Sequence, residues 1–194
     1  MVILQCLVFD WILVNVFKVD VEHYWPLNAD VTVYGSFTVT SDGRGISWGD
    51  HPAPRHTRNL LKGVTDVVSS NSGNVAILNT SDMVAFGGVD LDLPTGIPTT
   101  GVRSVSATAL AFAALYLDGS VRAWGDDFYG GSSKLCVVTG SSTSYTETSC
   151  LSSLSDVKEI TSNHAAFVAL FNSGAVKAWG RDIYGGALLS DPSI

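Results

Sequence analysis

The side chains that most often carry out catalysis or bind metals are scattered in this sequence of 194 residues. No histidine stands with a cysteine or a carboxylate at the spacing of a zinc site, and no pair of carboxylates can be assigned to acid–base hydrolysis. The histidines are His23, His51, His56 and His164. We therefore expect no enzyme activity, no metal site and no cofactor.

Two loops that each follow a Trp-Gly pair carry residues suited to binding another protein. They read GDDFYGG, which ends at residue 131, and GRDIYGG, which ends at residue 186. Acidic side chains interleaved with tyrosine favour a protein interface, because tyrosine supplies contact area at a low entropic cost. The alternative is that each tyrosine packs under its Gly-Gly turn and serves only the fold. The candidate binding residues are Asp126, Asp127, Tyr129, Arg181, Asp182 and Tyr184.

Both loops belong to a unit that recurs along the chain. An aromatic residue followed by glycine recurs at steps of 38, 38 and 55 residues. These pairs are Trp48-Gly49, Phe86-Gly87, Trp124-Gly125 and Trp179-Gly180. A valine stands 22 positions before each of the last three aromatic residues, whereas Pro26 takes that place in the first unit. Such fixed spacing predicts a structural repeat in which the pairs have a structural role.

The repeated unit predicts a β-hairpin that stacks on its neighbours. Two apolar runs flank a short polar turn in each unit, and the 19 glycines belong to turns, without helical periodicity. Units of this length cannot bury their own faces, so they stack as propeller blades with the aromatic residue as a wedge between them. We predict an all-β, propeller-like array of about four short antiparallel blades. Its repeat domain is residues 33–194, with units at about 33–61, 62–100, 101–154 and 155–194.

The third and fourth units resemble a known repeat family. The segments VRSVSATALAFAALYLDGSVRAWGDDFYGG and VKEITSNHAAFVALFNSGAVKAWGRDIYGG are similar to repeats of the regulator-of-chromosome-condensation family, and the resemblance covers roughly residues 33–190. Members of that family usually close a seven-bladed ring. The resemblance therefore implies an array that is incomplete relative to the ring, and a fragment of a longer polypeptide is favoured over a half-ring.

The resemblance is more specific for fold than for function, because the family includes an exchange factor for a small nuclear GTPase, parts of ubiquitin ligases and a photoreceptor. We expect a non-catalytic scaffold that binds another protein of unknown identity, and exposed blade flanks could mediate self-association. One alternative is a regulator of a small GTPase of the nucleotide-exchange type. Another is a membrane-tethered or secreted repeat protein. The net charge of −7 repels phosphate backbones, so nucleic acid is not an expected partner.

Residues 1–32 form an apolar N-terminal segment of uncertain status. The first seventeen residues read MVILQCLVFDWILVNVF, and contact with a membrane could occur only through them. A central Asp10 costs about 3 kcal/mol on insertion, which the apolar residues offset by a similar or somewhat larger amount. The sequence shows no clear basic stretch before the apolar run and no clear cleavage site after it, so these features do not support a signal peptide. Buried strands and a membrane or secretory segment both stay open.

The longer step between the third and fourth aromatic residues contains an insertion. Residues 134–150 read KLCVVTGSSTSYTETSC and are bracketed by Cys136 and Cys150. A disulfide between these cysteines would close the base of the insertion, whereas a cytosolic setting would keep both thiols reduced. The sequence leaves the two alternatives open. A cytoplasmic or nuclear location is slightly favoured over a membrane or secreted one.

Overall fold

The computed structural model describes residues 8–9, 12–13, 28–32, 35–40, 43–48, 53, 55–87, 93–151 and 153–187. Within these residues the chain is almost entirely strand and turn. The helical segments are α1 (Arg55–Arg58) and two short 3-10 turns, η1 (Asp127–Tyr129) and η2 (Asp182–Tyr184). The prediction of an all-β protein is therefore confirmed.

The apolar N-terminal segment is described only in part. β1 (Val8–Phe9) and β2 (Ile12–Leu13) pair with each other in antiparallel fashion. The other positions of residues 1–17, on which the membrane alternative rests, lie outside the described part of the chain, as does Gly49. Across the described ranges, no helix combines the length and the apolar character that crossing a membrane requires.

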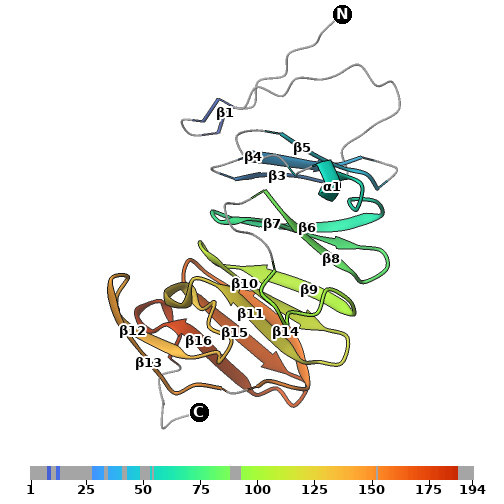
Figure 1. Ribbon diagram of the computed structural model, residues 1–194. Coiled ribbons are helices and arrows are strands. Elements are labelled where there is room, and N and C mark those ends of the chain that lie inside the picture. The colour runs from blue at the N-terminus through green and yellow to red at the C-terminus, as the bar shows by residue number, and fades with distance from the viewer. Residues whose placement is uncertain are drawn as a thin grey trace, which may run out of the picture.

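After the β1–β2 pair, four larger sheets follow one another along the described chain, and in each of them the last strand of the repeat unit contains one of the repeated aromatic residues. Blade 1 consists of β3 (Asn28–Thr32), β4 (Gly35–Val39) and β5 (Gly45–Trp48), and blade 2 of β6 (Val64–Ser70), β7 (Gly73–Leu78) and β8 (Met83–Phe86). Blade 3 consists of β9 (Val102–Ala107), β10 (Ala111–Tyr116) and β11 (Val121–Gly125), and blade 4 contains β14 (Val157–Ser162), β15 (Ala166–Phe171) and β16 (Val176–Arg181). Figure 1 shows the blades stacked in sequence order, from blue to red.

Three of the four aromatic residues act as wedges between successive blades, as the repeat predicts. Phe86 packs on Phe37 of blade 1 with ring centroids 4.8 Å apart. Trp124 and Trp179 lie in apolar clusters that combine residues of their own blade with residues of the preceding one. Exposed fractions are 3% for Phe86, 5% for Trp124 and 0% for Trp179, but 36% for Trp48. Trp48 is therefore not buried between blades, and the expectation for it is wrong.

The reason for the exposure of Trp48 is its position in the array. We call the face of a blade that is directed toward the preceding unit its leading flank, and the opposite face its trailing flank. Phe37 and Val39 on the trailing flank of blade 1 are buried against blade 2. Trp48 pairs with Ser36 in the register of β4 and β5, so its side chain lies on the leading flank. No blade among the described residues covers that flank.

The valine found 22 positions before each wedge makes a repeated contact between blades. The N–H groups of Val64, Val102 and Val157 donate to the carbonyls of Gly43, Ser81 and Gly119, respectively, at 2.9, 2.7 and 3.1 Å. Each acceptor lies in the hairpin turn of the preceding blade, and each donor begins the first strand of the next blade. This bond fixes the register of one blade on another while the apolar side chains fill the space between them.

The glycine after each buried tryptophan is required by the backbone. Gly125 and Gly180 have φ values of 110° and 102°, which side chains other than hydrogen rarely tolerate. A Cβ at either position would lie 2.6 Å from a backbone oxygen, that of Leu110 or that of Ala165. In each pair the aromatic residue therefore packs between blades. The glycine allows the backbone of its strand to lie close to the backbone at the start of the neighbouring strand.

The insertion adds two strands to the blade that follows it. β12 (Val137–Ser141) and β13 (Ser144–Thr148) form an antiparallel hairpin, and β12 pairs in parallel with β16 through Val137 with Gly180 and Val138 with Arg181. The resulting sheet has the order β13-β12-β16-β15-β14. In sequence the insertion belongs to the unit at 101–154, but in space its hairpin extends blade 4.

Candidate protein-binding face

Each loop after a buried tryptophan is a 3-10 turn that ends at a glycine. In blade 3 the carboxylate of Asp126 accepts a hydrogen bond from the N–H of Phe128 at 2.8 Å, and Gly130 has a φ of 89°. In blade 4 Arg181 takes the capping position without a side-chain hydrogen bond, and Gly185 has a φ of 86°. The repeated Tyr-Gly-Gly sequence thus has a structural reason that does not depend on binding.

Side chains of blade 4 join the two loops into one surface. The guanidinium carbon of Arg181 lies 4.4 Å from the ring centroid of Phe128 and 5.2 Å from that of Tyr184. The ring of His164 contacts both tyrosines, at 5.7 Å from Tyr129 and 5.4 Å from Tyr184. A guanidinium over aromatic rings is a favourable cation–π arrangement. The two loops therefore lie side by side, as equivalent positions of stacked blades require.

Strand β13 brings further acidic and aromatic side chains to this surface. Burial raises the pKa of Asp127, and the negative charges of Glu147 and Asp126 raise it further. The negative charge of Asp127 in turn raises the pKa of Tyr145, and the side chains of these two residues are hydrogen-bonded. The Nζ atom of Lys134 lies 3.9 Å from the Glu147 carboxylate, but this lysine is 69% exposed and solvent screens the pair. The surface carries an excess of negative charge that a cation would relieve.

We call this surface the post-tryptophan face. It consists of Asp126, Asp127, Phe128, Tyr129, Tyr145, Glu147, His164, Arg181, Ile183 and Tyr184. Large apolar or aromatic side chains are open to solvent here, with exposed fractions of 41% for Tyr145, 69% for Ile183 and 37% for Tyr184. Phe128 is 2% exposed and supports the face from below. Exposed aromatic residues surrounded by polar groups are typical of interaction surfaces.

The candidate residues from the sequence divide between surface and interior. Asp126 and Tyr184 are exposed, and Asp127, Arg181 and Asp182 are partly buried. Tyr129 packs against the apolar cluster between blades 3 and 4, as the structural alternative for this residue requires. All of them except Asp182 take part in the contacts and charge interactions of the face; for Asp182 the described contact is its backbone carbonyl, which accepts from Gly185.

Five members of the face are not among the candidate binding residues from the sequence. Phe128 and Ile183 lie within the two predicted loops, whereas Tyr145, Glu147 and His164 lie outside them. Tyr145 and Glu147 belong to the insertion, which only the parallel pairing of β12 with β16 brings to this position. His164 lies in the turn between β14 and β15. The alignment of the repeats could have indicated His164, because that turn recurs in each unit, but no local pattern indicates the position of the insertion.

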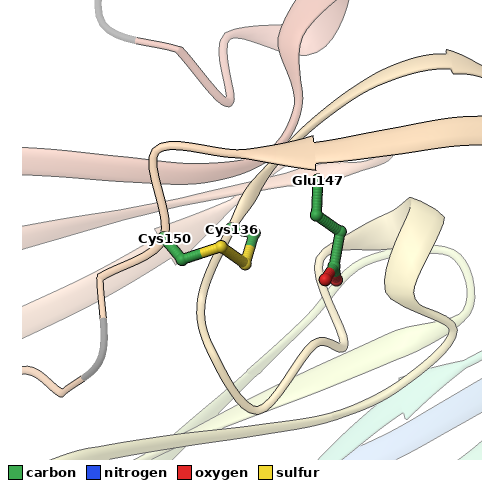
Figure 2. Close-up of side chains that lie close together, drawn as sticks. All are labelled: Cys136, Glu147 and Cys150. Carbon is green, nitrogen blue, oxygen red and sulfur yellow. A yellow bond between two sulfur atoms is a disulfide. The ribbon is translucent and has the colours of Figure 1, made fainter.

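A disulfide closes the base of the inserted hairpin. The sulfur atoms of Cys136 and Cys150 are 1.99 Å apart, with Cys136 buried directly before β12 and Cys150 exposed shortly after β13 (Figure 2). A carboxylate oxygen of Glu147 and the two sulfur atoms lie within 4.8 Å of one another. Thiolates bind metals, whereas these sulfurs are bonded to each other, so the group gives no reason to assign a metal.

Comparisons with known proteins identify the fold. No protein-family profile and no curated protein sequence matches the chain. Among solved structures, the chain is similar to human WBSCR16, with a TM-score of 0.56 and 16% identity over 91% of this chain and 53% of that one. It is also similar to yeast RCC1 (Prp20) bound to Kap60, with a TM-score of 0.53 and 13% identity over 91% of this chain and 51% of that one.

A separate structure of Prp20p from Saccharomyces cerevisiae, described together with its binding to Gsp1p and histones, gives a TM-score of 0.53 and 16% identity over 87% of this chain and 48% of that one. The chain spans about half the length of these proteins. The chain therefore has the fold of β-propeller repeats of the regulator-of-chromosome-condensation type. At these identities the similarity concerns the fold alone.

Proposed function

We propose that this chain is a non-catalytic protein-interaction scaffold that binds its partner at the post-tryptophan face. The observation that carries the proposal is the convergence of equivalent loops from blades 3 and 4, together with β13, into one surface with exposed aromatic residues and three carboxylates. The flanks of stacked blades are used for packing, so the loops at the blade ends are the part of such a fold that is free to specialise.

The charge of the face favours a cationic segment of another protein. Burial raises the pKa of Asp127, and repulsion from the carboxylates of Glu147 and Asp126 raises it further. A lysine or arginine placed among them would relieve this repulsion, and the aliphatic part of its side chain could lie on Tyr145 and Tyr184. The net charge of −7 for the chain adds long-range attraction for such a segment.

The direct test compares a lysine-rich peptide with a glutamate-rich peptide of equal length by isothermal titration calorimetry. We expect binding of the lysine-rich peptide only, and weaker binding at higher salt. Tyr184→Ala and Glu147→Gln should each weaken it by roughly three- to tenfold, a loss in the range found for contacts at an interface. Asp118→Asn is the matched control, because Asp118 lies in the turn at the opposite end of the β10–β11 hairpin.

Two results would contradict the proposal. Equal binding of the two peptides would show that charge does not select the partner. An equal loss of binding in Asp118→Asn and Glu147→Gln would show that the effect follows net charge and not the post-tryptophan face.

The alternative of a GTPase regulator is supported by similarity of fold alone. Prp20p is described with Gsp1p and histones as the molecules that it binds, and the present chain shares that fold over about half of Prp20p. Faster release of labelled nucleotide from a small GTPase in the presence of the chain would support this alternative. An unchanged release rate removes it.

A specific observation favours the secreted alternative, namely the Cys136–Cys150 disulfide. Disulfides persist in oxidising compartments and are rare in the cytosol. Mapping of disulfide-linked peptides from the natural source, after blocking of free thiols at lysis, tests this point. A linked Cys136–Cys150 peptide supports export of the chain, whereas two blocked thiols support the cytoplasmic or nuclear location.

A further inference from the structure

Strand β13 lies at the edge of the sheet of blade 4. The sheet has the order β13-β12-β16-β15-β14, so one side of the β13 backbone pairs with β12, and no described strand pairs with the other side. Every residue of β13 is at least partly exposed. Neighbouring blades pack against the flanks of a sheet, whereas a further strand is added at its edge. The use of this edge as an interface therefore does not depend on how many blades stand beside blade 4.

The register of the β12–β13 hairpin shows which backbone groups of β13 point outward. Ser141 and Ser144 close a two-residue turn opposite each other, so they form a pair that exchanges both backbone hydrogen bonds. From there to Val137 the register has no shift, and such pairs alternate with pairs that exchange none. Tyr145 and Glu147 belong to the second kind. Their N–H and C=O groups therefore point away from β12, toward the edge of the sheet.

The side chains of the same two residues lie on the post-tryptophan face. Alternate residues of a strand point to opposite sides of the sheet, so Tyr145 and Glu147 share one side, where Tyr145 is hydrogen-bonded to Asp127. The hydroxyl residues of β13 lie on the other side and are exposed, namely Ser144, Thr146 and Thr148. One side of this edge is thus acidic and aromatic, and the other carries small hydroxyl groups.

Strand β13 lacks the features that usually protect an edge strand from pairing with another chain. Such strands commonly carry lysine or proline, or are twisted by a β-bulge. The sequence of β13 is SYTET, and its register with β12 contains no shift. An edge of this kind is suited to β-augmentation, in which an extended peptide adds as a further strand. Backbone hydrogen bonds then supply affinity, and alternate side chains supply specificity.

We infer that the partner segment binds as an extended strand along β13, with a lysine or arginine at every second position beside Tyr145 and Glu147. This inference rests on the proposed function, because the negative charge of the post-tryptophan face selects the cations. The residues between the cations meet the hydroxyl side chains on the other side of the sheet, where no charge is required. The recognised sequence therefore alternates cationic and neutral residues and is not a block of basic residues.

The first test compares two peptides of about seven residues, which is within the usual length of a strand, by isothermal titration calorimetry. One peptide alternates lysine with threonine, and the other has the same composition with its lysines in one block. We expect the alternating peptide to bind roughly three- to tenfold more tightly, because its lysines all reach the acidic side of the edge.

Backbone N-methylation of the alternating peptide supplies the matched control. One form is methylated at every lysine and the other at every threonine, so charge and side chains are unchanged. An added strand directs the N–H groups of only one of these two sets toward β13. Methylation of that set should weaken binding by about tenfold or more, because it removes the hydrogen bonds to β13, and methylation of the other set should have little effect.

Amide hydrogen exchange measured by NMR locates the added strand on the protein. Binding of the alternating peptide should slow the exchange of the N–H groups of Tyr145 and Glu147, which point to the edge. The N–H of Thr146 faces β12, so its exchange should change little and serves as the internal reference.

Three results would overturn the strand arrangement. The first is equal binding of the two methylated peptides, and the second is binding without protection of the Tyr145 and Glu147 N–H groups. The third is slow exchange of these groups in the chain alone at high protein concentration, which would show that a second copy occupies the edge. If lysine peptides bind but the alternating one is not preferred, the strand arrangement is wrong and the proposed function stands. If no lysine peptide binds, both are wrong.

Discussion

The indole N–H of Trp179 donates a 3.1 Å hydrogen bond to the backbone carbonyl of Gly130, which belongs to the loop of the preceding blade. This bond joins the wedge of blade 4 to the post-tryptophan loop of blade 3, so the packing of the blades also fixes the position of the candidate binding residues. The equivalent indole nitrogen of Trp124 is buried and has no partner among the described residues. The two tryptophans therefore fill the same space but differ in hydrogen bonding.

This difference predicts unequal effects of the same substitution. Both substitutions introduce a smaller ring, but Trp179→Phe also leaves the carbonyl of Gly130 without its hydrogen-bond donor. We therefore expect Trp179→Phe to lower the free energy of unfolding by about 1–3 kcal/mol more than Trp124→Phe does. Trp124→Phe removes an unpaired donor and places in blade 3 the residue type that blade 2 carries at Phe86. Urea unfolding of the two variants measures the difference. Equal losses would show that the bond to Gly130 contributes nothing.

A second pair of substitutions tests the wedge itself. Trp179→Ala removes a side chain that is 0% exposed and leaves a cavity between blades 3 and 4, which should cost about 3–5 kcal/mol. Trp48→Ala removes a side chain of the same kind from a flank where it is 36% exposed, so we expect a clearly smaller loss in dilute solution. Thermal unfolding of the monomer gives both values. Losses of equal size would contradict the stacking described for the blades.

The stacking itself was predictable from the sequence, because the spacing of Trp124 and Trp179 and of the valines before them reflects contacts that recur in every unit. Two outcomes were not predictable in this way. Trp48 follows the same pattern as the buried wedges, and its exposure depends on the absence of a described blade before it. Phe128 and Ile183 occupy equivalent positions, yet Phe128 is 2% and Ile183 is 69% exposed. The difference arises from neighbours that a repeat pattern does not contain.

The candidate site, like the fold, could be predicted from the sequence only in part. Asp126, Arg181 and Tyr184 could be named because they recur at fixed positions after tryptophan. Tyr145 and Glu147 reach the face through the pairing of Val137 with Gly180, a parallel contact between residues far apart in sequence. Parallel pairing has no local turn signal, so no sequence pattern could place the insertion beside blade 4.

The disulfide predicts a stabilising effect that is confined to the insertion. Cys136 and Cys150 are separated by 14 residues, and closing a loop of this size contributes about 3 kcal/mol in the chain-entropy description. We expect Cys150→Ser, or a dithiol reductant, to lower the melting temperature and to speed hydrogen exchange in β12 and β13. The control is the same reductant added to Cys150→Ser, which should change neither quantity further. Faster exchange spread evenly over all blades would contradict a local role.

Two aspartates predict opposite responses of stability to pH. The pKa of Asp127 is raised in the folded chain, chiefly by burial and then by Glu147 and Asp126, whereas hydrogen bonds from Ser120 lower the pKa of Asp118. A raised pKa gives a contribution to stability that is present below the unfolded pKa and lost as pH rises through the folded value. Ionised Asp127 therefore destabilises the fold at neutral pH, and ionised Asp118 stabilises it.

The corresponding measurement is urea unfolding of Asp127→Asn and Asp118→Asn at pH 7 and over a series of acidic pH values below 3.8, the ordinary pKa of an aspartate carboxyl. At pH 7 we expect Asp127→Asn to be more stable than the wild type and Asp118→Asn to be less stable. The difference for Asp127→Asn should shrink below pH 3.8, where the Asp127 carboxyl is protonated in both states, whereas the difference for Asp118→Asn should shrink only as the pH falls further, through the lowered pKa of Asp118. A stability gain in Asp127→Asn that persists unchanged at acidic pH would show that packing, and not the charge of Asp127 beside Glu147, is responsible.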